Sequence, residues 1–244
     1  GHLFYHIHNP GPYELGHFLK HYPKAKVLYI VRDPIQNLES WIWDKHVFNS
    51  VKERWRSIVE KIVGMSRLIC FPFDSQNHAH GIALEDVKRD ADQVMPRIAE
   101  WMGISDHPSL YESSFCGLQY WGPGSNATQR ISGFDTQAID HEVGRFFGSR
   151  DILVLETLFW PFSKQFGYTE LDSEEFRRQL KEIRPWLDEP LEFEEKLYAI
   201  FPDQSRNFTD FPPYNRLHKF FYMLWDLLER EGAYKNLLTD LIKK

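Results

Sequence analysis

The sequence has 244 residues, of which 42% are hydrophobic, 16% aromatic and 26% charged, and its net charge is −6. This composition predicts a packed core and argues against a general nucleic-acid-binding surface, because phosphate backbones demand a basic stripe. Cys70 and Cys116 have no paired spacing, which excludes a disulfide scaffold and a cysteine-based zinc site and suits a reducing compartment such as the cytoplasm. No apolar run approaches membrane-spanning length, so the sequence predicts no membrane span.

The first predicted element is a strand over residues 3–8, which alternates large apolar residues with histidines. It is stopped by Asn9-Pro10-Gly11-Pro12, a tight turn fixed by proline. His8 occupies the last strand position before this turn. A strand histidine is by default a structural residue; at the end of a strand it can instead face a ligand crevice. A short helix is predicted next, over residues 13–21.

Residues 27–31 form a short apolar run bounded by charge, which predicts a parallel strand buried on both faces. Asp33 and Pro34 then supply an N-cap acceptor and a proline at the first helical position. Arg32 therefore leaves the carboxyl end of a strand, and Ser40 lies about two turns into the next helix. Ligands of open α/β sheets bind outside strand carboxyl ends, so this stretch is a candidate phosphate site. The alternative is a surface ion pair at Arg32 and a solvated hydroxyl at Ser40.

Helical periodicity returns over residues 51–68, and a further strand is predicted over 81–84. A charged run follows, and then a long amphipathic helix with Gly103 in the C-cap position. Residues 113–133 are rich in Gly, Ser, Thr, Asn and Pro, and a loop this long is usually functional or mobile.

The rest of the chain is predicted to be helical. Two helices are expected over residues 136–147 and 151–166. From residue 173 onward the sequence shows apolar stripes, without a strand pattern or a ligand cluster, and further helices are expected over 173–187, 190–200 and 214–243. We therefore predict two units: an α/β domain of residues 1–168 and a helical extension of residues 169–244, which packs on that domain or on a partner chain.

The string Ile30-Val31-Arg32-Asp33-Pro34, with Ser40 eight residues after the arginine, resembles the 3′-phosphate-binding signature of the PAPS-dependent sulfotransferases. These enzymes transfer the sulfuryl group of 3′-phosphoadenosine 5′-phosphosulfate (PAPS). The similarity covers about residues 6–168, roughly the later two-thirds of a sulfotransferase domain. It implies a P-loop-NTPase-like parallel sheet flanked by helices, followed by an α-helical C-terminal extension.

A second block carries the same resemblance. The strand predicted over residues 81–84 and the run Glu85-Asp86-Val87-Lys88 are similar to the strand–Glu-Asp-Leu-Lys–helix segment of sulfotransferases, with valine in place of leucine. The family uses this segment chiefly for architecture. Glu85 and Asp86 are therefore expected to be structural residues.

The resemblance also implies roles for individual site residues. Arg32 and Ser40 would hold the 3′-phosphate of PAPS. His8 would be the catalytic base, since its segment resembles the family's Thr-His-x-Pro motif, although the threonine is missing. Arg130 and Gly133 would belong to the late loop that closes over the 3′-phosphate and the adenine; a plain flexible loop is the alternative. No metal is implied.

One part of the family pattern is missing. Sulfotransferases bind the 5′-phosphosulfate with a glycine- or serine-rich loop and a lysine that open a helix near the N-terminus, and the sequence contains no such loop. Either the upstream part is not in this chain, or the protein has lost the loop and with it transfer activity. A sheet without its first strand should show an exposed edge, a homo-oligomer contact there, or cover by the C-terminal helices.

The implied reaction is sulfuryl transfer from PAPS to a hydroxyl or amine of a small-molecule or glycan acceptor, with His8 as general base. The alternative is a catalytically inactive nucleotide-binding or protein-interaction module. A P-loop kinase of similar fold is less well supported, because the sequence has no Gly-Lys-Ser/Thr motif.

Overall fold

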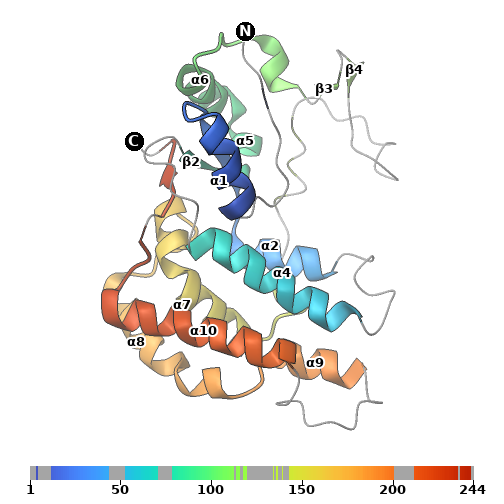
Figure 1. Ribbon diagram of the computed structural model, residues 1–244, viewed down its shortest axis with the longest axis vertical. Helices are drawn as coiled ribbons and strands as arrows, with labels where there is room; N and C mark the ends of the chain where they lie inside the picture. Colours follow the sequence, from blue (N-terminus) through green and yellow to red (C-terminus); the bar gives the residue numbers. More distant parts are fainter. Residues whose placement is uncertain are drawn as a thin grey trace.

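The computed structural model describes residues 4, 12–43, 53–70, 79–112, 114–115, 118–119, 134, 136, 139, 143–200, 212–235 and 237–242 (Figure 1). The predicted strand over residues 3–8 lies outside the described residues, apart from Phe4. The described elements, in chain order, are α1 (Pro12–His21), β1 (Val27–Val31), α2 (Pro34–Trp43), α4 (Glu53–Cys70), β2 (Ala79–Ala83), α5 (Leu84–Arg89), α6 (Ala91–Met102), η1 (Pro108–Tyr111), β3 (Ser114–Phe115), β4 (Leu118–Gln119), α7 (Ser149–Phe166), α8 (Ser173–Ile183), η4 (Pro185–Asp188), α9 (Glu192–Ile200), α10 (Pro212–Glu231) and β5 (Thr239–Asp240).

The centre of the fold is a small parallel sheet with the strand order β1-β2-β5. The pairing of β1 with β2 runs from Val27 opposite Ala79 to Val31 opposite Ala83, so both strands end at the same level. The α/β class and the parallel sheet are confirmed. None of the described helices has the length and apolarity that crossing a bilayer requires.

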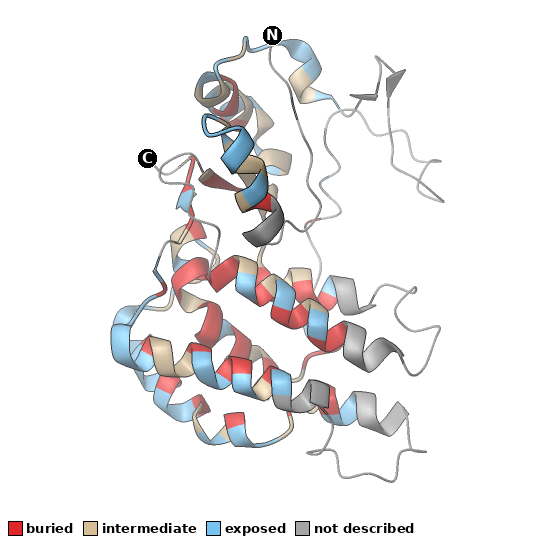
Figure 2. Ribbon diagram, in the orientation of Figure 1, coloured by how far each residue is buried: buried red, intermediate tan, exposed pale blue. Residues whose placement is uncertain are grey.

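Helices cover the two faces of this sheet (Figure 1). On one face α6 packs through Val94 and Ile98 against Ile82 of β2. On the other face a larger cluster joins α2, α4, α7, α8 and α10, and their buried residues face one another (Figure 2). Gly81 lets α7 approach the sheet, because a Cβ at this position would lie 2.4 Å from Cζ of Phe166.

The prediction that the strand over residues 27–31 is buried on both faces is wrong. Ile30 is 57% exposed, and the other residues of β1 are half-buried. The reason is that β1 lies at the edge of the described sheet, and the apolar cluster on the α6 face includes Leu28 but not Ile30.

The helix predicted over residues 136–147 is wrong where the chain is described, since residues 143–147 form bends. Gly144 has a φ of +103°, which a continuing helix does not allow. The backbone amides of Gly144, Phe146 and Phe147 donate to the buried carboxylate of Glu39, with N–O distances of 2.6–2.9 Å. A side chain from α2 therefore takes the amide donors that a helix would have used.

The C-terminal part departs from its prediction in the same way. A single helix was expected over residues 214–243, but α10 ends at Glu231, where Gly232 adopts a φ of +71°. The following segment returns to the sheet, and Gly81 of β2 pairs with Asp240 of β5. A two-residue strand has no recognisable sequence pattern, and only its partner strand defines it.

Candidate functional site

The candidate site lies where β1 and β2 end. Val31 pairs with Ala83, so β1 and β2 end at the same level. Arg32 and Asp33, which follow β1, therefore lie beside Leu84 and Glu85, which follow β2, at the carboxyl edge of the sheet. This edge is where parallel sheets bind ligands. Asp33 caps α2 as the sequence predicts, because its Oδ1 accepts the amide N–H of Gln36 at 2.7 Å.

Arg32 is half-buried and oriented by α2. Its Nε–H donates to Oε1 of Gln36 at 3.0 Å, and the Gln36 side-chain amide donates in turn to the carbonyl of Ile139 at 3.0 Å. Ser40 is exposed, one turn beyond Gln36. Because side chains four residues apart share a helix face, the Arg32 guanidinium and the Ser40 hydroxyl lie along the same side of α2.

Glu85 links the ends of the two strands. The residue is 8% exposed; Oε1 accepts the amide N–H of Asp33 at 3.2 Å, and Oε2 accepts a hydrogen bond from the Tyr168 hydroxyl at 2.8 Å. Glu85 therefore joins the β1–α2 turn to the residue that follows Gly167 at the end of α7. The sequence does not indicate this role of Tyr168, because nothing local connects a residue after α7 with the end of β2.

A cavity of about 430 Å³ opens beside these residues. Its walls carry four carboxylates (Asp33, Glu85, Asp86 and Glu156) but, among the described residues, one guanidinium, that of Arg89. Apolar side chains, among them Ile35, Ile152 and Phe166, complete the walls. No local pattern in the sequence indicates this cavity, since its carboxylates come from separate segments.

Two acids of the cavity, Asp33 and Glu156, have raised pKa values. Burial, together with the negative charge of Glu85, raises the pKa of Asp33, against the hydrogen bond from Gln36 that lowers it. Burial and the charge of Asp33 raise the pKa of Glu156. The pKa of Tyr168 is raised by burial and by its bond to Glu85. Such walls repel phosphate, so an anionic group would have to lie outside the cavity, on the side of α2 that carries Arg32 and Ser40.

Of the predicted site residues, Arg32 and Ser40 fall in the part of the chain that the structure describes, and they share one side of α2. His8, Arg130 and Gly133 lie outside the described residues, so their roles stay predictions. In the described ranges no group of three or more His, Cys, Asp or Glu side chains could hold a metal ion.

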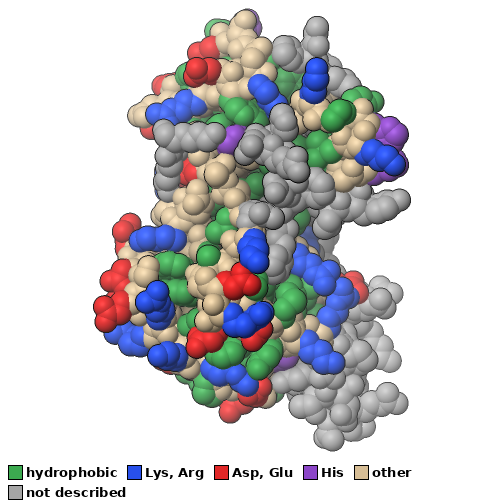
Figure 3. All heavy atoms as spheres, turned by 60° about the vertical axis from the view of Figure 1, so that its left-hand side comes forward, with side chains coloured by type: hydrophobic (Ala, Val, Ile, Leu, Met, Phe, Trp, Pro, Cys, Tyr) green, Lys and Arg blue, Asp and Glu red, His purple; other side chains and the backbone are tan. Residues whose placement is uncertain are grey.

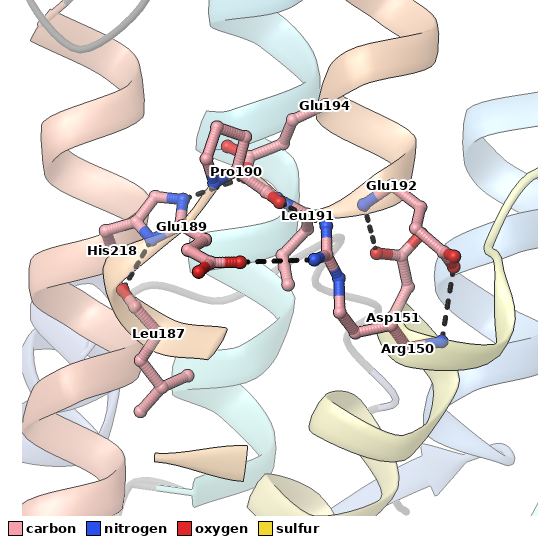
Figure 4. A network of polar contacts seen from close by, with 9 residues as sticks. All are labelled: Arg150, Asp151, Leu187, Glu189, Pro190, Leu191, Glu192, Glu194 and His218. Carbon is pink, nitrogen blue, oxygen red and sulfur yellow. Dashed lines mark hydrogen bonds and ion pairs between the residues drawn. The ribbon is translucent and has the colours of Figure 1, made fainter. Parts of the chain in front are cut away.

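A second cluster of titratable side chains lies away from this site, among the helices (Figure 4). Asp151 of α7 accepts three backbone amides, and His218 of α10 contacts Glu194 of α9. On the face shown in Figure 3, the described Lys and Arg side chains are interspersed with Asp and Glu.

No protein-family model matches the chain, and no curated protein or solved structure shows significant similarity to it.

Proposed function

We propose that the protein binds adenosine nucleotides that carry a 3′-phosphate, with Arg32 and Ser40 as phosphate ligands, and that it transfers the sulfuryl group of PAPS. The observation that carries this proposal is the placement of a half-buried guanidinium and an exposed hydroxyl along one side of α2, directly after a parallel strand. The dipole of α2 adds a favourable field for a negative charge near the N-terminus of this helix.

The proposed reaction is an in-line displacement at sulfur. The acceptor oxygen or nitrogen forms a bond to the sulfur while the bond between sulfur and the 5′-phosphate oxygen breaks, and adenosine 3′,5′-bisphosphate leaves with the electron pair. His8 takes the proton of the acceptor as general base.

The acidic cavity supports the choice of an acceptor amine over an acceptor hydroxyl. Carboxylates at Asp33 and Glu156 attract an ammonium group and can accept the proton that it loses before the free amine attacks sulfur, and the apolar walls suit an organic body. The volume of about 430 Å³ fits a small molecule.

The second candidate is a nucleotide-binding module without transfer activity. Turnover with labelled PAPS separates the two candidates. Labelled sulfate on an amine acceptor supports transfer, and tight nucleotide binding without turnover supports the silent module.

Calorimetric titration with adenosine 3′,5′-bisphosphate tests the binding function directly. We expect Arg32→Ala to weaken binding by about 10- to 100-fold, which is the loss of charge-assisted hydrogen bonds worth ~1.5–3 kcal/mol. Ser40→Ala should weaken it less, because its hydroxyl is neutral and exposed.

Arg178→Ala is the matched control, since this exposed arginine of α8 pairs with Glu175 at 3.7 Å within its own helix. Adenosine 5′-phosphate, which has no 3′-phosphate, should bind the wild type and Arg32→Ala equally. An unchanged affinity of Arg32→Ala for the bisphosphate would remove the assignment.

A further inference from the structure

A continuous chain of hydrogen bonds runs from the end of α7 to the Arg32 guanidinium. The Tyr168 hydroxyl donates to Oε2 of Glu85 at 2.8 Å, and Oε1 of the same carboxylate accepts the Asp33 amide at 3.2 Å. Oδ1 of Asp33 then accepts the Gln36 amide at 2.7 Å. Finally, Oε1 of Gln36 accepts the Nε–H of Arg32 at 3.0 Å. These bonds tie together residues that follow α7, β2 and β1.

The far end of this chain is held firmly. Gly167 ends α7 in the left-handed region, with a φ of +76°, and the amide of Tyr168 donates to the Ser163 carbonyl at 2.8 Å. The ring of Tyr168 stacks near Phe162, with 6.3 Å between the centroids. The hydroxyl therefore comes from a fixed position on the large helical core.

The middle of the chain is a buried carboxylate with both oxygens engaged. Glu85 is 8% exposed and lines the cavity, so loss of the Tyr168 hydroxyl leaves Oε2 to cavity water, which does not fix the carboxylate as the tyrosine does. A shift of Glu85 acts on the Asp33 amide, which lies next to Arg32 in the β1–α2 turn.

We propose that Tyr168 and Glu85 are positioning residues that set the orientation of the Arg32 guanidinium through Asp33 and Gln36. This inference rests on the proposed role of Arg32 as a phosphate ligand. A guanidinium recognises phosphate through a planar fork of N–H groups, so a fixed plane lowers the entropy lost on binding.

Tyr168→Phe tests the inference, because it removes the hydroxyl and keeps the ring. We expect the affinity for adenosine 3′,5′-bisphosphate to fall by about three- to tenfold, the range that immobilising one rotamer-rich side chain spans. The affinity for adenosine 5′-phosphate should not change. In the Arg32→Ala background the same substitution should have no further effect, because the chain acts through Arg32. Equal losses for both nucleotides, or additive losses in the double variant, overturn the inference.

NMR of the nucleotide-free protein supplies a readout that does not depend on the nucleotide function. The Arg32 Nε–H should give a heteronuclear NOE typical of an ordered group in the wild type and a lower value in Tyr168→Phe. Gln36→Met, which cuts the last link and leaves Glu85 untouched, should give the same decrease. An ordered Arg32 Nε–H in both variants overturns the inference.

Tyr111→Phe is the matched control, since its hydroxyl also donates to a carboxylate, Asp106 at 2.9 Å, and neither residue belongs to the chain of bonds or lines the cavity. It should change neither readout. If Arg32→Ala binds the bisphosphate as the wild type does, the proposed function fails, and the Arg32 NOE still decides whether the chain of bonds orders the guanidinium.

Discussion

Several buried carboxylates in this protein hold the backbone together. Glu39, Glu85 and Asp151 are at most 8% exposed, and each accepts at least one main-chain N–H. Asp151 accepts three, from Gly148, Glu192 and Phe193, at 2.7–2.9 Å, and Figure 4 shows the one from Glu192. Burial raises the pKa of Asp151 to about 6, even though these amides lower it. Acids of this kind join segments that are distant in sequence, because each supplies the acceptors that irregular backbone lacks.

His218 is the basic counterpart of these acids. Its Nδ1 lies 2.9 Å from the Leu187 carbonyl and its Nε2 lies 2.8 Å from Oε2 of Glu194. Because both partners are acceptors, the imidazolium form satisfies both. Burial lowers the pKa of His218, but the bond to Glu194 and the charges of Glu194 and Asp188 outweigh it, so the pKa lies above 6.5.

This shift predicts a pH dependence of stability. The folded pKa of His218 is raised, so its contribution is fully present below the unfolded pKa of about 6.5 and is lost as pH rises through the folded value. Urea unfolding from pH 5.5 to 9 should show His218→Gln destabilised by ~2 kcal/mol at the acid end, with a smaller difference at the alkaline end. His17→Gln, on the exposed face of α1, is the control. A difference from the wild type that does not change with pH would contradict the prediction.

Close approach between elements decides how β2 and α7 pack. Successive residues of a strand point their side chains to opposite faces of the sheet. Gly81 has no side chain at the position where Phe166 of α7 lies against the sheet. Phe166 is 4% exposed and belongs to the cluster that joins the helices of this face. The glycine therefore sets the distance between the sheet and α7, and with it the position of Tyr168, two residues further on.

Gly81→Ala should destabilise the protein by ~1–3 kcal/mol, because its Cβ would lie 2.4 Å from Cζ and 2.8 Å from Cε1 of Phe166. Phe166→Leu should offset part of this loss in the double variant, so that the two losses are less than additive. Gly64→Ala in α4 is the control; its Cβ meets nothing within 4 Å, and we expect a gain of ~0.5–1 kcal/mol from helix propensity. Chemical denaturation measures the free energy of unfolding of the two single variants, the double variant and the control against the wild type. Additive losses would show that contact with Phe166 is not the cause.

At the scale of the whole molecule, the C-terminal helices share the core of the preceding part. The larger apolar cluster contains Ile58 and Ile62 of α4, Leu158 of α7, and Leu217 and Phe221 of α10. β5 adds to the sheet beside β2, and the Leu241 amide donates to the Gly81 carbonyl at 2.9 Å. Residues on both sides of the domain boundary predicted at residue 168 thus share one apolar cluster and one sheet.

This shared core predicts the outcome of removing residues 169–244. We expect residues 1–168 alone to lose cooperative unfolding, because α4 and α7 would expose the apolar faces that α8 and α10 cover in the full chain. Near-UV circular dichroism and urea unfolding, with the full chain as reference, check this expectation. A cooperative transition in the shortened protein would instead support two independently folding domains.

The sequence alone determined the elements whose signals are local. Asp33 and Pro34 start α2, and Gly103 ends α6, because caps and left-handed glycines act within a single turn. The tertiary structure decided the rest: Glu39 meets Gly144 across 105 residues and Tyr168 meets Glu85 across 83, while Asp33 and Glu156 meet at one cavity. Such contacts have no local signature, since they depend on how the sheet and its helices bring distant segments together. The sequence could therefore place Arg32 at a strand end, and only the packed chain shows which groups orient it.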